Sequence, residues 1–257
     1  MSTLQDIVFL CLTFQYLGAI LVIDTMIGGY AVEIAGLQKT TLLDYPGRIA
    51  CTVFLPGCNL RCPFCHNASL VLRPRPLLSQ DELLAFLQTR KRKLDGVCVT
   101  GGEPTLHKDL PQLLADIKSM GFLVKLDTNG TRPQSLRLLL ESGLVDYVAM
   151  DIKNSPSKYA ATCGGPEVLE AVRQSVSLLE ASDVEHEFRT TVLHPLHSPA
   201  EMEAIGQWLS GTKQYFIQAF VDSGDLIGGG QALTEQEMHA MLDAVKPHIP
   251  NAQLRGI

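Results

Sequence analysis

The sequence predicts an α/β fold, a partial (β/α)6 barrel of the open, TIM-like kind. Three observations predict it. From residue 50 onward, short β-branched or apolar runs alternate with amphipathic stretches, as in repeated β–α units around a parallel sheet. Six such units are found, too few to close an eight-stranded barrel. Polar clusters follow the ends of the predicted strands, where barrels of this kind carry their chemistry.

Each element has its own local signal. Strands are expected at Ala50–Leu55, Gly96–Thr100, Phe122–Asp127, Tyr147–Asp151, His186–Val192 and Tyr215–Phe220. The first helix is expected to begin after Ser79, a hydroxyl N-cap that acidic residues follow. Later helices are expected at Leu110–Met120, Pro133–Ser142, Pro166–Ala181, Pro199–Leu209 and Thr234–Val245.

The composition indicates one globular domain. With 257 residues, of which 46% are hydrophobic, the chain can bury one sizeable core. Its formal net charge is -6, whereas a nucleic-acid partner would need a basic face. We therefore expect no nucleic-acid partner.

Residues 1–28 form an apolar amino-terminal extension, and the main domain is expected over residues 29–257. Ile7–Ile23 approaches membrane-spanning length. A membrane anchor or signal peptide should carry flanking Lys or Arg, yet no basic residue precedes Lys39, so a membrane location is disfavoured. The extension could instead be a packed helix or strand that covers the barrel. We favour a third interpretation, a start-site artefact in which the native chain begins near Met26.

The cysteines favour a metal site in a reducing compartment. The chain has seven: three lie close together, and Cys11, Cys51, Cys98 and Cys163 are scattered. In a chain of this size, the pattern is typical of metal binding rather than of a disulfide framework. We expect a cytoplasmic protein in which Cys51 and Cys98 are core residues of strands.

Cys58, Cys62 and Cys65 form a CxxxCxxC loop directly after the first predicted strand. Thiolates suit zinc or an iron–sulfur cluster, and a structural zinc site normally has four ligands. Three cysteines can bind three irons of a 4Fe–4S cluster and leave the fourth iron open. His66 could instead complete a zinc site, so zinc remains the alternative at this point.

The CxxxCxxC loop, with the aromatic Phe64 before its last cysteine, resembles the signature of the radical S-adenosylmethionine (SAM) superfamily. The resemblance implies one 4Fe–4S cluster on the three cysteines and SAM chelated to the open iron by its amino and carboxylate groups. It also implies that an electron from the cluster breaks the sulfonium bond and yields a 5′-deoxyadenosyl radical. Phe64 and His66 become expected SAM contacts, and residues 29–257 become a radical SAM domain.

The segment Thr100-Gly101-Gly102-Glu103-Pro104 ends the second predicted strand and resembles the GGEP motif of the same family. Adjacent glycines let the backbone approach a ligand closely, and Glu103 offers an acceptor to the amino group of SAM. An ordinary turn is the alternative. Its place after a strand favours SAM binding by Gly101, Gly102 and Glu103.

Two acidic segments, Asp127-Thr128-Asn129-Gly130 and Asp151-Ile152-Lys153, end the third and fourth predicted strands. They could be plain turns. Converging on one rim, Asp127, Asp151 and Lys153 would instead suit the ribose hydroxyls and the carboxylate of SAM. Both segments resemble those of glycyl-radical-enzyme activases. In the activase of pyruvate formate-lyase such residues also bind a monovalent cation, which implies a cation site at Asp127, Thr128 and Asp151.

Further polar residues lie on the last two predicted strands. Gln218 is an expected SAM contact, and Thr190 and Thr191 are weaker candidates. Arg189 could pair with a carboxylate on the rim, although a strand arginine is as often a structural charge. Three histidines are expected to be surface or turn residues: His107, His194 and His197.

Three segments resemble anaerobic ribonucleoside-triphosphate reductase activating proteins of the longer type. They are Gly36-Leu37-Gln38-Lys39-Thr40-Thr41, Asp44-Tyr45-Pro46-Gly47-Arg48 and Cys65-His66-Asn67. Tyr45 replaces a glycine of the Asp-Gly-Pro-Gly turn of other activases, which favours this branch over formate-lyase activation. The resemblance implies an anaerobic oxidoreductase that cleaves SAM reductively and abstracts hydrogen from a glycine of a partner enzyme.

The expected partner is therefore a glycyl radical enzyme, in particular anaerobic ribonucleotide reductase. Because the chain has no additional CxxC cluster, a separate flavodoxin or ferredoxin is expected to supply the electron. The alternatives are a glycyl radical enzyme of the pyruvate formate-lyase type, a small-molecule substrate as in the deazaguanine-forming branch, and a non-catalytic electron-transfer or zinc module. Replacing any cysteine of the triad is expected to abolish SAM cleavage, whereas Cys163→Ala is expected to leave it intact.

Overall fold

The computed structural model describes residues 32–73, 75–164 and 167–257. The predicted extension over residues 1–28, with Cys11 and Met26, lies outside the described residues. Within the described ranges, no helix combines the length and the apolar character needed to cross a membrane.

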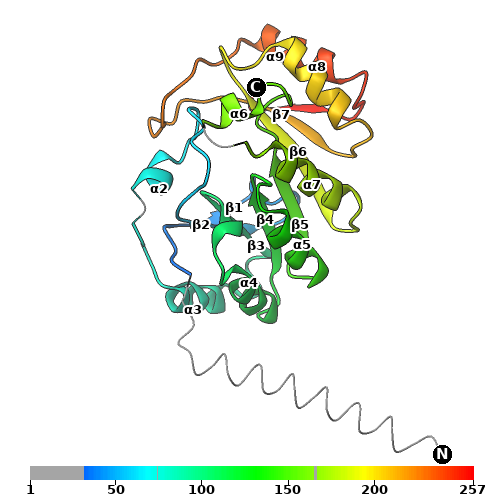
Figure 1. Ribbon diagram of the computed structural model, residues 1–257. Coiled ribbons are helices and arrows are strands. Elements are labelled where there is room, and N and C mark those ends of the chain that lie inside the picture. Colours follow the sequence, from blue (N-terminus) through cyan, green and yellow to red (C-terminus); the bar gives the residue numbers. More distant parts are fainter. Residues whose placement is uncertain (1–31, 74, 165–166) are drawn as a thin grey trace, which may run out of the picture. The chain divides into compact units, whose positions relative to one another are not determined.

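One mixed sheet organises the described chain (Figure 1). Its strands pair in chain order from β1 to β8, and the two ends of this order are not paired with each other, so the barrel is open. The parallel part contains β2 (Ala50–Leu55), β3 (Gly96–Gly101), β4 (Leu123–Thr128), β5 (Tyr147–Asp151), β6 (Glu185–Val192) and β7 (Tyr215–Ala219). These are the six predicted strands, confirmed to within one residue at each end, and the predicted open α/β barrel is confirmed with them.

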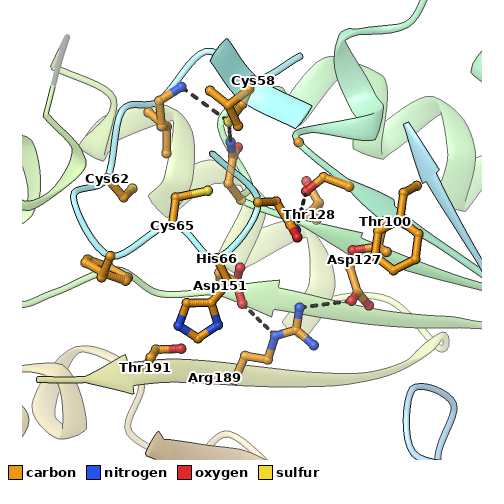
Figure 2. Close-up of a pocket in the computed structure, with 18 of the residues that line it drawn as sticks. Cys58, Cys62, Cys65, His66, Thr100, Asp127, Thr128, Asp151, Arg189 and Thr191 are labelled. Atoms are coloured by element: carbon orange, nitrogen blue, oxygen red, sulfur yellow. Dashed lines mark hydrogen bonds and ion pairs between the residues drawn. The ribbon is translucent and has the colours of Figure 1, made fainter. Parts of the chain in front are cut away.

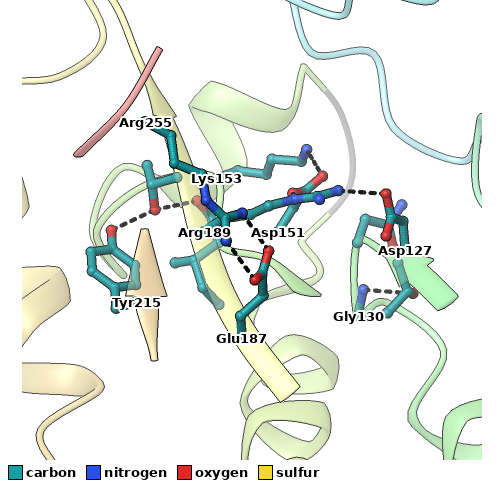
Figure 3. Close-up of polar contacts among 12 residues, drawn as sticks. Asp127, Gly130, Asp151, Lys153, Glu187, Arg189, Tyr215 and Arg255 are labelled. Atoms are coloured by element: carbon teal, nitrogen blue, oxygen red, sulfur yellow. Dashed lines mark hydrogen bonds and ion pairs between the residues drawn. The ribbon is translucent and has the colours of Figure 1, made fainter. Parts of the chain in front are cut away.

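Two further strands extend the sheet at its edges. β1 (Gly36–Thr41) pairs antiparallel with β2, and β8 (Gln253–Arg255) pairs parallel with β7. The guanidinium of Arg255 holds the β8 edge through two hydrogen bonds of 2.7 and 2.8 Å to the buried Glu187 (Figure 3). The prediction of six units omitted both strands.

Helices connect the strands: α3 (Gln80–Arg90), α4 (Leu110–Ser119), α5 (Pro133–Glu141), α7 (Leu169–Glu180), α8 (Pro199–Trp208) and α9 (Glu235–Val245). All were predicted. Ser79 caps α3 through a capping box with Glu82. The apolar face of α4 packs into the core, and each of its four buried residues is at most 1% exposed. Three short helices were not predicted: α2 (Ala68–Leu72), the 3-10 turn η1 (Pro104–Leu106) and α6 (Tyr159–Cys163).

Candidate active site

A cavity of about 430 Å³ lies inside the open barrel, a size typical of small-molecule sites. Its wall is built by the loops at the carboxyl ends of the parallel strands and by the interior of β1 and β2. It brings together all but one of the predicted site residues: Cys58, Cys62, Phe64, Cys65, His66, Gly101, Gly102, Asp127, Thr128, Asp151, Lys153 and Gln218 (Figure 2). Residues distant in sequence therefore line one cavity.

The cysteine loop follows β2 and presents its thiols to the cavity (Figure 2). The sulfur of Cys58 accepts hydrogen bonds from the Leu60 amide at 3.4 Å and from Asn129 Nδ2 at 3.7 Å. Burial raises the pKa of the Cys58 and Cys65 thiols. Among the described residues, no group of three or more His, Cys, Asp or Glu side chains is arranged to hold a single metal ion.

Cys163 is a buried neighbour of this loop that sequence reasoning missed. Its carbonyl oxygen accepts a hydrogen bond of 2.9 Å from the Arg61 amide in this loop, and its neighbouring thiol is the main reason that the pKa of Cys62 is lowered to about 7. The neighbouring Cys62 thiol, together with burial, raises the pKa of Cys163. Nothing in the spacing of the sequence indicates this pair, because α6 brings Cys163 to the loop.

The glycine pair at the end of β3 packs against the cysteine loop. Gly101 has a φ of +123°, and a Cβ on it would lie 2.2 Å from the carbonyl oxygen of Leu55. A Cβ on Gly102 would lie 1.8 Å from the carbonyl oxygen of Gly57. Both glycines line the cavity, but the close approach that requires them is to the neighbouring backbone.

Glu103 is the predicted site residue that the cavity does not include. It is fully buried, and its carboxylate accepts hydrogen bonds from the Asn129 amide at 2.6 Å and the Thr128 hydroxyl at 2.7 Å. Burial raises its pKa, although hydrogen bonds from Thr105, Asn129 and Thr128 oppose that shift. This placement differs from the expected contact with an amino group of the ligand, because the carboxylate faces the loop after β4. Glu103 instead joins two of the cavity loops.

Charged side chains from three strands form a network across the floor of the cavity (Figures 2 and 3). Arg189 Nε lies 2.5 Å from Asp151 Oδ1, and Arg189 Nη2 lies 3.0 Å from Asp127 Oδ2. Lys153 Nζ lies 2.9 Å from Asp151 Oδ2, and the buried Lys125 pairs with Asp127. Burial alone would raise the pKa of both carboxyl groups, but these cations outweigh it and lower them. Arg189 thus pairs with the rim carboxylates, one of its two expected roles.

The predicted monovalent cation would have to compete with this network. Both carboxylates already face cationic side chains, and the Thr128 hydroxyl donates to Glu103. The structure does bring the three residues to one cavity. Sequence reasoning missed Lys125, because a lone lysine within a strand normally points to solvent.

His197 is a third missed residue: it was expected to be a surface or turn residue, and a surface position is wrong. It is 3% exposed, and its Nε2 lies 2.9 Å from the carbonyl oxygen of Lys153. Its ring meets that of Phe64 edge to face, with centroids 6.3 Å apart. His194 is partly exposed near Glu237, and His107 ends η1, as expected of surface and turn residues.

A loop from the carboxyl-terminal half, residues 221–231, forms hydrogen bonds with the cysteine loop and with α2, which follows it. The amides of Gly228 and Gly229 donate to the carbonyl oxygen of Pro63 at 2.8 and 2.9 Å. Asp225 accepts from the amide of Ser69 at 3.1 Å and from its hydroxyl at 2.7 Å. Asp225 thereby caps α2, since Asn67, at the N-cap position, makes no side-chain cap.

Residues 52–209 match the family model of the radical SAM superfamily. The chain belongs to this superfamily, whose members bind SAM and a 4Fe–4S cluster with three cysteine ligands. It is a radical SAM enzyme, and the thiols on the cysteine loop are the donor set that such a cluster takes.

Similar proteins cover different shares of the chain. A Methanocaldococcus jannaschii protein, provisionally named a glycyl-radical enzyme activating enzyme, is 30% identical over 232 residues, which are 87% of this chain and 96% of that protein. A 7-carboxy-7-deazaguanine synthase of Halobacterium salinarum is 40% identical over 76 residues, which are 29% of each chain. The crystal structure of Streptococcus suis SuiB has a TM-score of 0.63 at 14% identity, over 78% of this chain and 47% of SuiB. That likeness shows the fold alone.

Proposed function

We propose that this radical SAM enzyme activates a glycyl radical enzyme, by cleaving SAM reductively and abstracting hydrogen from a glycine of the partner. The observation that carries the proposal is the extent of the cavity. It runs from the cysteine loop to Asp44 and Gln38, within the segments that resemble activating proteins of anaerobic ribonucleoside-triphosphate reductase. The similarity to the Methanocaldococcus jannaschii protein over nearly its whole length supports the same class. Anaerobic ribonucleotide reductase is the partner that we propose.

Two groups of cavity residues bind the cofactors in this proposal. Cys58, Cys62 and Cys65 hold the 4Fe–4S cluster, and eight further residues bind SAM: Phe64, His66, Gly101, Gly102, Asp127, Asp151, Lys153 and Gln218. When bound together, the cluster supplies one electron and SAM supplies the radical that takes a hydrogen atom. Ion pairs around Arg189 hold both positive and negative side chains in place before the ligand binds. Such an arrangement suits SAM, which carries an amino group and a carboxylate.

The location and the reductant are further parts of the proposal. All six cysteines in the described ranges are free thiols, which supports a reducing, cytoplasmic environment. A separate flavodoxin or ferredoxin is the proposed electron donor. A pyruvate formate-lyase type partner is an alternative. A small-molecule substrate is another, and the Halobacterium salinarum relative supports it over less than a third of the chain.

SAM cleavage tests the chemistry. The protein is reconstituted with iron and sulfide under anaerobic conditions, reduced with dithionite and mixed with SAM, and 5′-deoxyadenosine is measured. We expect cleavage by the wild type and by the control Cys51→Ala, whose thiol lies in β2 away from the cavity lining. Ala at position 58, 62 or 65 should abolish it. A fully loaded wild-type cluster that leaves SAM intact would contradict the proposal, and a zinc-loaded, iron-free native protein would favour the zinc alternative.

Electron paramagnetic resonance then tests the partner. The reduced enzyme is mixed with SAM and with anaerobic ribonucleotide reductase from the same source, and a glycyl radical doublet is expected. A doublet that appears only with a pyruvate formate-lyase type enzyme would replace the partner but keep the activity. SAM cleavage without a doublet in any candidate would indicate a small-molecule substrate.

A further inference from the structure

Asn129 presents its side-chain amide to a sulfur of the cysteine loop. Its Nδ2 lies 3.7 Å from the Sγ of Cys58 and 3.1 Å from the Oδ1 of Asn59. Its Oδ1 accepts hydrogen bonds from the backbone amide and the hydroxyl of Thr131, at 3.0 and 2.7 Å. An asparagine side chain has two donor hydrogens and two acceptor lone pairs, and all of them have partners here. Because Asn129 is only 5% exposed, these contacts hold it in one orientation.

The contacts with Thr131 fix which end of the Asn129 amide faces Cys58. A backbone N–H can only donate, so the side-chain atom that accepts from the Thr131 amide must be the oxygen. The amide nitrogen then faces the sulfur. Asn59 closes a ring of side chains, because its Nδ2 donates to Thr131 Oγ1 at 2.9 Å. Reversing the Asn129 amide would set its oxygen against the Oδ1 of Asn59 and leave the Thr131 amide without its acceptor.

The backbone of Asn129 is tied to the cysteine loop as well. Its amide donates to the buried carboxylate of Glu103 at 2.6 Å. The amide of Glu103 in turn donates at 2.8 Å to the carbonyl oxygen of Gly57, the residue before Cys58. Protein contacts alone therefore hold the donor nitrogen and the acceptor sulfur next to each other.

We infer that Asn129 is a positioning residue of the cluster, whose side-chain amide donates a hydrogen bond to the sulfur of Cys58 and raises the reduction potential of the cluster. A hydrogen bond to a ligand sulfur stabilises the additional negative charge of the reduced state. Reduction is the step from which SAM cleavage starts. The inference rests on the proposed ligation by the triad and is independent of the partner enzyme.

Two other roles for Asn129 make different predictions. It lines the cavity, so it could contact SAM directly, and its loss would then leave the potential of the SAM-free cluster unchanged. It could instead hold the cysteine loop only through Asn59, and breaking the ring at either asparagine would then have the same effect.

The test replaces each asparagine of the ring by leucine, which has a similar shape and no polar atom. Asn129→Leu removes the donor to Cys58, whereas the matched control Asn59→Leu breaks the ring and leaves that donor in place. A second pair, Asn129→Asp and Asn59→Asp, introduces the same charge at both positions and keeps an acceptor for Thr131 at position 129, which favours folding. Each full-length protein is reconstituted with iron and sulfide, and its iron is counted. The midpoint potential is measured by a redox titration followed by electron paramagnetic resonance, without SAM or a partner enzyme.

We expect each variant to hold a full cluster. Asn129→Leu should lower the one-electron equilibrium constant for reduction about tenfold, a fall of about 59 mV in the potential, and Asn59→Leu should stay near the wild type. The aspartate variants should again differ, with the lower potential at position 129. Equal potentials within both pairs would overturn the inference, and so would a wild-type potential in Asn129→Leu. Iron lost from both Asn129 variants would overturn it in favour of a residue needed for ligation itself. A cluster that survives replacement of the triad would instead remove the proposed ligation.

Discussion

The carboxylate of Glu103 accepts a hydrogen bond of 2.6 Å from the backbone amide of Asn129. This contact joins the loop after β3 to the loop after β4, and Asn129 continues the connection to Cys58 through its side chain. The acidic residue of the Gly-Gly-Glu-Pro segment therefore holds these loops together.

Glu103→Ala should destabilise the protein by about 3 kcal/mol, because it leaves buried donors of Thr128 and Asn129 without an acceptor. The affinity of Glu103→Ala for SAM, measured by calorimetry, should also fall. Glu103→Gln, which keeps the shape of the side chain and one acceptor oxygen, should lose less stability than Glu103→Ala. An alanine variant as stable as the wild type in urea unfolding would show that the network contributes nothing.

Arg189→Met should lower the free energy of unfolding by about 3–5 kcal/mol. The substitution leaves the carboxylates of Asp127 and Asp151 with one lysine partner each in a largely buried site. Arg189→Lys should recover only part of this, since an ammonium cannot reach both carboxylates as the planar guanidinium does. The measurements are the free energy of unfolding and SAM affinity.

The control for this experiment is Arg137→Ala, which breaks an exposed pair with Glu141 at 3.8 Å. It should leave both quantities unchanged, because exposed pairs contribute little. If Arg189→Met resembles the control, the network does not hold the site.

His197 should stay neutral at pH 7 and titrate below its ordinary pKa of 6.5, because burial disfavours the charged ring. Its Nδ1 accepts from the amide of Leu193, so protonation would break that contact. In this range the unfolded state takes up the proton first, so stability should decrease as the pH falls below about 6.5. Imidazole nitrogen shifts in NMR give the pKa directly, and a value above 6.5 would contradict the placement. His197→Gln should remove its share of the pH dependence.

Asp225→Ala should loosen the cysteine loop, because it removes the cap that residues 221–231 provide to α2. Loss of a helix cap costs about 1 kcal/mol of stability. If the loop opens that much more easily, iron should be released to a chelator about fivefold faster. Asp222→Ala is the matched control, since in the described part of the chain the Asp222 side chain accepts from the amide of Gly224 within its own loop. Equal release rates in the two variants would show that the cap does not restrain the cluster loop.

The sequence predicted the parallel strands well because most of them are short runs rich in apolar or β-branched residues, although β4 contains two charged residues and β6 contains three. It missed β1, where Gln38, Lys39 and Thr40 are exposed at the sheet edge, and β8, which has three residues. The cysteine triad and the glycine pair, which line the cavity, could be singled out because each is a pattern of neighbours in sequence. Cys163, Lys125 and His197 were missed because only the folded barrel brings them to the site.

The contact of Gly102 with Gly57 has a consequence for how the cofactor enters. Because this contact and the cap from Asp225 involve protein atoms alone, we predict that the cysteine loop keeps its shape in the metal-free protein. Cluster insertion should then change the backbone structure little, and the far-ultraviolet circular dichroism spectra of the metal-free and loaded proteins should coincide. Gly102→Ala should disturb the metal-free protein as much as the loaded one.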